Sequence, residues 1–188
     1  MVVACRAVRS NNSLQLTLHA YGARVAERFR LVATKIKEGY YMIYLVSYMI
    51  GWVLTVIYYF INPDKGFIHA ALLMHLTFTV GFFGIFNFVG HSLFSEKVAL
   101  RIGLVSNGFQ KELGYTSLGI GICGIMCVFY QDAFWFATII PFSTLLIGAA
   151  VLHVAEIGQS KNYNPGNTWI ILPDMLMPAT LIVLWFLR

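Results

Sequence analysis

The chain has 188 residues, of which 59% are hydrophobic and only 11% are charged. Soluble domains carry about 25% charged residues, and a soluble chain of this length cannot bury so much apolar surface. The composition therefore indicates an integral membrane protein whose solvent is the lipid bilayer. The net charge of +5 does not indicate a nucleic-acid partner, because the chain has no phosphate-binding loop and no zinc-ligand spacing.

The first 38 residues form a basic segment, which we separate from a membrane domain at residues 39–188. Between residues 14 and 37, apolar side chains recur in steps of three and four, and basic side chains occupy the opposite face. This pattern predicts an amphipathic helix that lies in the headgroup plane with its arginines on anionic lipid. Two alternatives are a helix that docks in a partner's groove and a mitochondrial presequence, the latter because no acid precedes Glu27.

Five long apolar segments follow, each of the length that crosses a hydrocarbon core of about 30 Å. None shows the two-residue alternation of a barrel strand, so we predict an all-α fold, a bundle of five transmembrane helices. The predicted spans are Tyr40–Ile61, Phe67–Val89, Glu112–Phe129, Ala133–Ala155 and Thr168–Leu187. The predicted connections are a turn at 62–66, a polar segment at His91–Lys111, a hairpin at 130–132 and a loop at Gly158–Asn167.

Lysine and arginine side chains predict the orientation, because they are enriched in cytoplasmic loops. Eleven of them fall in the N-terminal segment and in the loops after the second and fourth spans, whereas only Lys65 and Arg188 fall on the other side. We therefore expect a cytoplasmic N-terminus in a bacterial inner membrane, with the mitochondrial inner membrane as the alternative. The chain alone does not distinguish a homo-oligomer from a subunit of a larger membrane complex.

Small residues recur at helical spacing in four of the spans, which predicts close helix packing. These residues are Ser47, Gly51 and Thr55, then Thr77, Gly81 and Gly84, then Ser117, Gly121 and Gly124, and finally Gly148 to Ala150.

The predicted topology brings polar residues from four spans to one level near the inner surface. The second span ends with Asn87 and His91, and the fourth ends with His153 and Glu156; each pair shares a helix face. Glu112 begins the third span. The predicted ligand- or ion-binding site consists of Asn87, His91, Glu112, His153, Glu156 and Asp174.

Asp174 is the most informative of these residues, because an aspartate at the centre of a span costs about 2.5–3.5 kcal/mol on insertion scales. Its side chain must therefore face the bundle or a wet cavity. Pro173 and Pro178 each remove a backbone donor, so we expect a bent helix beside Asp174. A carboxylate beside a bend is typical of cation and proton sites, and a structural hydrogen bond to a neighbouring helix is the alternative.

The same cluster supports a metal or redox site as an alternative. Di-iron bundles use a Glu-x-x-His pair on each of two helices, whereas this chain has the reverse order, His153-x-x-Glu156, once. A haem needs an axial histidine near mid-depth, and only His75 lies there, where we interpret it as a packed side chain. The identity of any metal or cofactor is left open, and no catalytic residue is predicted because no nucleophile motif surrounds a serine.

Four motifs in order resemble a family of small bacterial membrane proteins of unknown function. They are Phe109–Gly114, His153–Glu156, Asn164–Asn167 and Asp174–Pro178, over about residues 80–188. The resemblance implies no known activity. The Glu-x-Gly start of the Gly-rich third span also resembles the wider DoxX-like group, whose redox associations imply quinone or thiol chemistry; this chain lacks that group's four-helix pattern and has no Cys-x-x-Cys pair.

Three functions are consistent with these observations. The first is a non-enzymatic subunit or small carrier, with an inner-side polar cavity for a cation, a proton or a small ligand. The second is a membrane oxidoreductase or metal-binding protein that uses the same Glu, His and Asp cluster. The third is a structural subunit of a larger complex. Whether the protein is an enzyme is left open.

Overall fold

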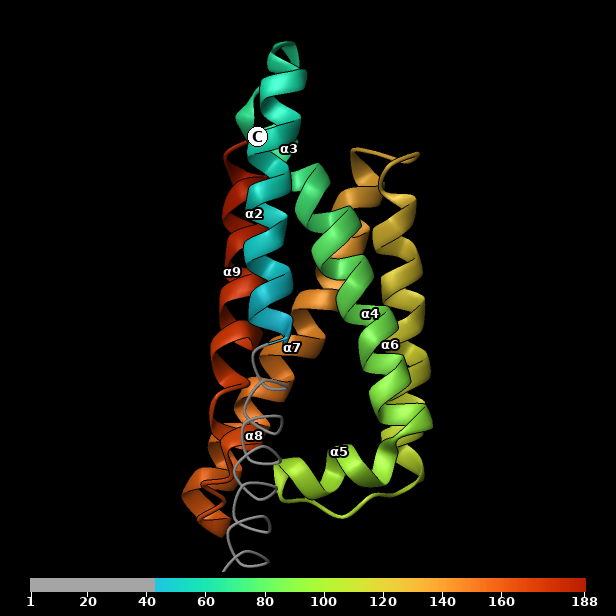
Figure 1. The fold of residues 1–188 in the computed structure, drawn as a ribbon, viewed down its shortest axis with the longest axis vertical. Helices are drawn as coiled ribbons and strands as arrows, with labels where there is room; N and C mark the ends of the chain where they lie inside the picture. The colour runs from blue at the N-terminus through green and yellow to red at the C-terminus, as the bar shows by residue number, and fades with distance from the viewer. Residues whose placement is uncertain (1–42) are drawn as a thin grey trace, which may run out of the picture. The chain divides into compact units, whose positions relative to one another are not determined.

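The structure of the protein, a computed structural model, describes residues 43–188 (Figure 1). The predicted amphipathic helix and the domain boundary at residue 38 lie outside this range. Between residues 43 and 188 the chain is helical with short turns and has no strand. Four helices are long and apolar enough to cross a membrane, as expected of an integral membrane protein: Ile43–Ile61, Phe67–Leu93, Ala133–Ser160 and Pro165–Phe186.

The first of these, α2 (Ile43–Ile61), packs on the second, which is a continuous helix with two wide turns. The second helix consists of α3 (Phe67–Met74), a π-helical segment (His75–Val80), α4 (Gly81–Phe88) and a second π-helical segment (Val89–Leu93). Its predicted end at Val89 was four residues short. π-helical turns are rare and cluster at functional sites. Periodicity in a sequence cannot reveal them, because they arise from packing.

The helix α6 (Gly108–Met126) corresponds to the third predicted span. It has a polar first turn, with Gln110, Lys111 and Glu112, and it is not among the four helices that meet the length and hydropathy criteria of a span. It packs antiparallel along α4 (Figure 1). The predicted glycine stripe forms this contact.

Glycines set the distance between α4 and α6 over their whole length. A Cβ at Gly84 would clash with Gly121 Cα and Ser117 O, and a Cβ at Gly124 would lie 2.8 Å from Gly81 N. At the other end, a Cβ at Gly114 would clash with Ser92 Oγ. Only residues without a Cβ allow backbones to approach this closely, so the packing prediction is confirmed here. It was wrong at Gly148, where a Cβ would meet nothing within 4 Å.

The polar segment between the second span and α6 contains a helix that the sequence did not predict. This helix, α5 (Ser95–Ile102), lies across the end of the bundle in Figure 1. It ends at Gly103, whose φ of 77° is left-handed and favours glycine. Eight residues are too few for helical periodicity to stand out in a polar stretch, which explains why the segment was interpreted as a loop.

The last two helices differ from their predicted bounds. α7 (Ala133–Ser160) continues five residues beyond its predicted end at Ala155, into the stretch predicted as a loop from Gly158. The fifth predicted span continues as one helical stretch, Pro165–Phe186: α8 (Pro165–Thr168) leads into α9 (Ile171–Phe186) through Trp169 and Ile170, whose φ and ψ angles are both helical. Pro173 has no backbone N–H to donate to Trp169 O, which accounts for the local turn at these two residues. The bend expected beside Asp174 stays a prediction.

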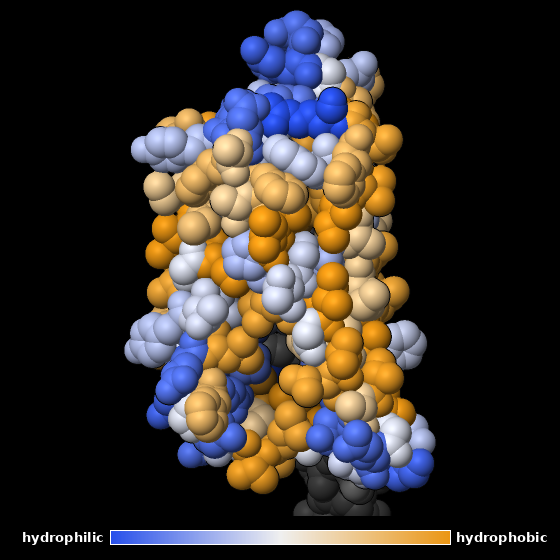
Figure 2. Space-filling view, turned by 180° about the vertical axis from the view of Figure 1, so that it is seen from behind, coloured by the Kyte–Doolittle hydropathy of each residue, from blue (hydrophilic) through white to orange (hydrophobic). Residues whose placement is uncertain are grey.

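The surface agrees with a membrane setting. Figure 2 shows hydrophobic residues around the middle of one face, with hydrophilic residues gathered at its two ends. Arg188 forms an ion pair with Asp132, so the C-terminus and the turn between α6 and α7 lie at one end. The helices α5 and α8 contact each other at the opposite end (Figure 1).

Candidate functional site

The loop between α7 and α8 is organised by the buried side chain of Asn167, the last residue of the Asn-Pro-Gly-Asn motif. Its amide nitrogen donates to two backbone carbonyls, His153 O at 3.1 Å and Asn162 O at 3.0 Å. Both partners are acceptors only, so the orientation of the amide is determined by its hydrogen bonds. Asn167 Oδ1 must therefore act as an acceptor on the other side.

A second asparagine ties this loop to α5. Asn162 Nδ2 donates to Ile102 O, at the end of α5, at 2.8 Å. Asn162 Oδ1 accepts from Asn164 Nδ2 at 2.7 Å. A side chain at Gly103 would clash with Asn164, so the left-handed turn that ends α5 also permits this close contact. The loop is thus fixed to three helices before any ligand is considered.

These hydrogen bonds determine the tautomer of His153, near the end of α7. His153 Nδ1 lies 2.7 Å from Asn167 Oδ1, and because that oxygen only accepts, Nδ1 carries a hydrogen. In the neutral ring the lone pair is then on Nε2. That nitrogen faces Asp174 Oδ2 at 3.9 Å.

Asp174 lies in the first turn of α9 and is 4% exposed. Its Oδ2 is buried and has no hydrogen-bond partner within residues 43–188. A distance of 3.9 Å is within the range of an ion pair and too long for a direct hydrogen bond. An unpartnered carboxylate oxygen that faces an imidazole lone pair is unfavourable in an apolar region, so the pair needs a proton or a cation between its two atoms.

The other four predicted site residues occupy different positions. His91, in the second π-helical segment, is partly buried, and its Nδ1 has no hydrogen-bond partner among the described residues. Asn87 instead donates to Ser117 Oγ at 2.7 Å and accepts from Tyr44 at 3.2 Å, so it links α2, α4 and α6.

The two glutamates are not brought into hydrogen bonds or ion pairs by the part of the chain described here. Glu156 is partly buried on α7, one turn after His153. Glu112 is exposed on α6 and precedes Gly121 by nine residues, which is two and a half turns. It therefore lies on the face opposite the glycine contact with α4.

Residues 41–188 match the family described as "Family of unknown function (DUF6790)". The chain belongs to this family. A comparison with curated proteins finds no match, and neither does a comparison with solved structures. The expected resemblance to a family of unknown function is thereby confirmed, and no match to DoxX proteins is found.

The DUF6790 family has no assigned activity, so the site must be interpreted from its own geometry. No three His, Cys, Asp or Glu side chains between residues 43 and 188 are placed to hold a metal ion together. His75 is fully buried against the rings of Tyr48 and Trp52, with centroids 5.2 Å and 4.7 Å away. Its Nδ1 lies 3.0 Å from Thr79 Oγ1. We therefore interpret His75 as a packed side chain.

Sequence reasoning did not assign Asn162 and Asn167 to the site of this DUF6790 chain, although they determine the state of His153. A signal was present, because asparagines on both sides of a Pro-Gly pair are typical of side chains that bond to the backbone in turns. The depth argument favoured groups that titrate, and the one amide that it selected, Asn87, bonds to Ser117 and Tyr44 instead.

Proposed function

We propose that the protein is a five-span membrane protein that binds and releases a proton at the His153–Asp174 pair. The observation that carries this proposal is the tautomer of His153, which directs a lone pair at the buried, unpartnered Asp174 Oδ2 over 3.9 Å. One added proton removes the repulsion between the Nε2 lone pair and the carboxylate oxygen. The proton can lie on Asp174, which gives a carboxylic acid beside a neutral ring, or on His153, which gives a carboxylate beside an imidazolium. Both states have no net charge.

The deprotonated pair carries a net negative charge that is buried and unpaired. Such a state is costly in a membrane interior, so release of the proton favours uptake of another proton or of a cation. An exchange site is therefore favoured over a permanent ion pair.

In this proposal α6, the third predicted span, joins the four helices that are long and apolar enough to cross a membrane. Its 19 residues extend over about 29 Å, close to the thickness of a hydrocarbon core. It follows α4 antiparallel along its length, and α4 belongs to a span. The long stem of Lys111 can carry its charge to the interface. With five spans, the positive residues favour a cytoplasmic N-terminus and a site near the inner surface.

Infrared titration of the full chain in lipid nanodiscs tests proton binding. We expect a carboxyl signal that disappears as the pH rises, is lost in Asp174→Asn and changes in His153→Gln. Asp64→Asn is the matched control, because Asp64 is an exposed aspartate in the turn after α2. A titration that is unchanged in Asp174→Asn would show that the pair does not bind the proton.

A flux assay distinguishes a carrier from a subunit that only binds. In proteoliposomes with an internal pH indicator and an imposed potential, we expect proton entry with the wild type and with Asp64→Asn, but not with Asp174→Asn. If the pair titrates and no flux is observed, the protein is a proton-binding or structural subunit of a larger membrane complex. The metal alternative would then require ligands that residues 43–188 do not bring together.

The remaining proposals concern lipid contacts, the membrane in which the protein resides and a redox role. We propose contact of the N-terminal basic segment with anionic lipid, based on its charge pattern alone. A bacterial inner membrane is consistent with the same pattern. A DoxX-like redox role has only the Glu-x-Gly start of α6 in its favour, and Cys123 and Cys127 are free thiols there.

A further inference from the structure

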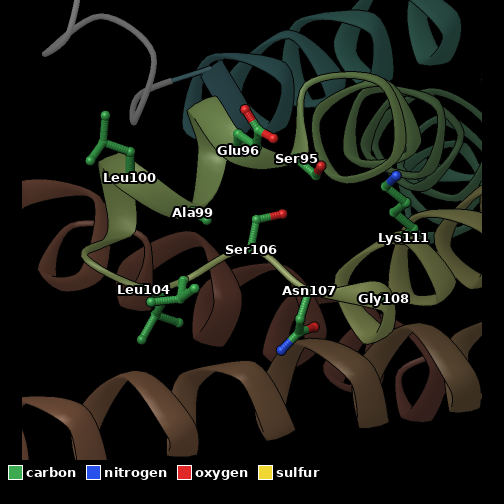
Figure 3. A pocket seen from close by; sticks show the side chains of 10 residues that line it. Ser95, Glu96, Ala99, Leu100, Leu104, Ser106, Asn107, Gly108 and Lys111 are labelled. Carbon is green, nitrogen blue, oxygen red and sulfur yellow. The ribbon is translucent and has the colours of Figure 1, made fainter.

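A pocket of about 680 Å³ lies between α5 and the start of α6, away from the His153–Asp174 pair. Ten residues line it, namely Ser95, Glu96, Ala99, Leu100, Leu104, Val105, Ser106, Asn107, Gly108 and Lys111. Figure 3 shows Ser95 and Lys111 toward one side of the pocket and Leu100 and Leu104 toward the other. The pocket is therefore amphipathic along its length.

Hydrogen bonds from three elements hold the walls of this pocket in place. Gln110 Nε2 donates to Ser95 O at 2.9 Å and joins the first turn of α6 to the first turn of α5. Ser92 Oγ donates to Lys111 O at 3.2 Å, and Asn107 Oδ1 accepts from Gln110 N at 3.2 Å. The pocket is thus built into the fold rather than formed by a loose loop.

The two charged residues of the pocket have opposite signs and are not paired. Neither Glu96 nor Lys111 takes part in an ion pair within the described part of the chain, and both are exposed. A ligand with one anionic and one cationic group would satisfy both charges at once. A simple anion would meet repulsion from Glu96, and a simple cation would meet repulsion from Lys111.

The surroundings of the pocket indicate the membrane interface. The helix α5 lies across the end of the bundle (Figure 1), and the ends of helices that cross a bilayer are expected at the headgroup region. Large apolar side chains beside the pocket are mostly exposed, including Leu100 at 79%, Val105 at 89% and Phe109 at 78%. Apolar side chains next to a charged helix face are typical of segments inserted at the headgroup and acyl boundary.

We propose that this pocket binds the headgroup of a zwitterionic phospholipid with an ammonium group, such as phosphatidylethanolamine. Lys111 binds the phosphate, Glu96 binds the ammonium group, and the leucines contact the first part of the acyl chains. The proposal is independent of the proton chemistry of the His153–Asp174 pair.

Native mass spectrometry of the full chain in detergent, titrated with phosphatidylethanolamine, tests the proposal. We expect the wild type to retain the lipid, and Lys111→Gln and Glu96→Gln each to weaken binding about tenfold, as expected for loss of one charged hydrogen bond. The matched control is Lys97→Gln, because Lys97 is an exposed lysine on α5 that does not line the pocket. This control should bind like the wild type.

Two further titrations separate the possible ligands. With phosphatidylglycerol, which has no ammonium group, we expect weaker binding to the wild type, and Glu96→Gln should abolish the preference for phosphatidylethanolamine. With free phosphoethanolamine, which has no acyl chains, we expect at least tenfold weaker binding. Equal binding of the two lipids, equal binding of the chain-free headgroup, or equal weakening by Lys97→Gln would each overturn the assignment. All three substituted side chains are exposed, so these variants should fold normally.

Discussion

The fully buried His75 and the partly buried His153 each make one hydrogen bond through Nδ1, but their Nε2 atoms have different neighbours. Each presents Nδ1 to one neutral partner, Thr79 for His75 and Asn167 for His153. The other nitrogen of His75 has no hydrogen-bond partner among residues 43–188 and is enclosed by aromatic rings, whereas that of His153 faces an acid at 3.9 Å. Only the second ring has a neighbour that can change its charge.

This comparison teaches that burial alone does not make a histidine a functional candidate. The described neighbours of His75 are aromatic rings and the Thr79 hydroxyl, so its ring fills space and makes one hydrogen bond. Proton exchange requires a second titratable group that stabilises the alternative charge state. Within the described residues, His153 has such a partner in Asp174, and the comparison can be tested at both sites.

The largest effect is expected for His153→Leu, which removes one member of the buried pair. Asp174 Oδ2 and Asn167 Oδ1 then both lose the group that they face, and removal of one partner from a buried pair costs about 3–5 kcal/mol. Thermal unfolding of purified protein in detergent should show a large decrease in Tm. The same substitution at the other ring, His75→Leu, is the control and should cost less, because no charged group is left unpaired there.

A smaller effect is expected for Gly51→Ala, which disturbs the packing around His75 without changing any titratable group. A Cβ at Gly51 would lie 2.5 Å from Thr79 Oγ1 and 2.9 Å from His75 Cε1, and overpacking of this kind costs about 1–3 kcal/mol. We expect a lower Tm with normal proton titration of the His153–Asp174 pair. Gly119→Ala is the control, because a Cβ there would meet nothing within 4 Å. Equal stability of the two variants would contradict the packing argument.

The sequence predicted the positions of the long helices better than it predicted the directions in which their side chains point. Apolar length located the four helices that are long enough to cross a membrane, and the spacing of Gly84 and Gly121 located a close helix contact. Charge counting placed residues by membrane depth, but depth does not determine the rotation of a helix about its axis. Glu112 and Asp174 were therefore grouped together, although Glu112 is exposed and Asp174 is buried.

The elements that sequence reasoning missed depend on contacts between distant segments. The π-helical segment at His75–Val80 lies where Gly51 of α2 and Gly124 of α6 approach it from two sides. The state of His153 depends on Asn167, whose amide is oriented by carbonyls of two other residues. Neither arrangement has a periodic signature in the chain, because each is a property of three-dimensional packing.

The smallest effect is expected for His75→Phe, which keeps an aromatic ring in the space between Tyr48 and Trp52. The substitution removes the hydrogen bond to Thr79, a loss of about 1 kcal/mol, and it also removes the buried Nε2 atom, which has no partner in the described part of the chain. These two changes oppose each other, so we expect a Tm close to that of the wild type. Proton titration and flux should also be unchanged. If His75→Phe abolished proton flux while the protein stayed folded, both histidines would belong to one proton path, and the distinction between a packed ring and a chemically active ring would be wrong.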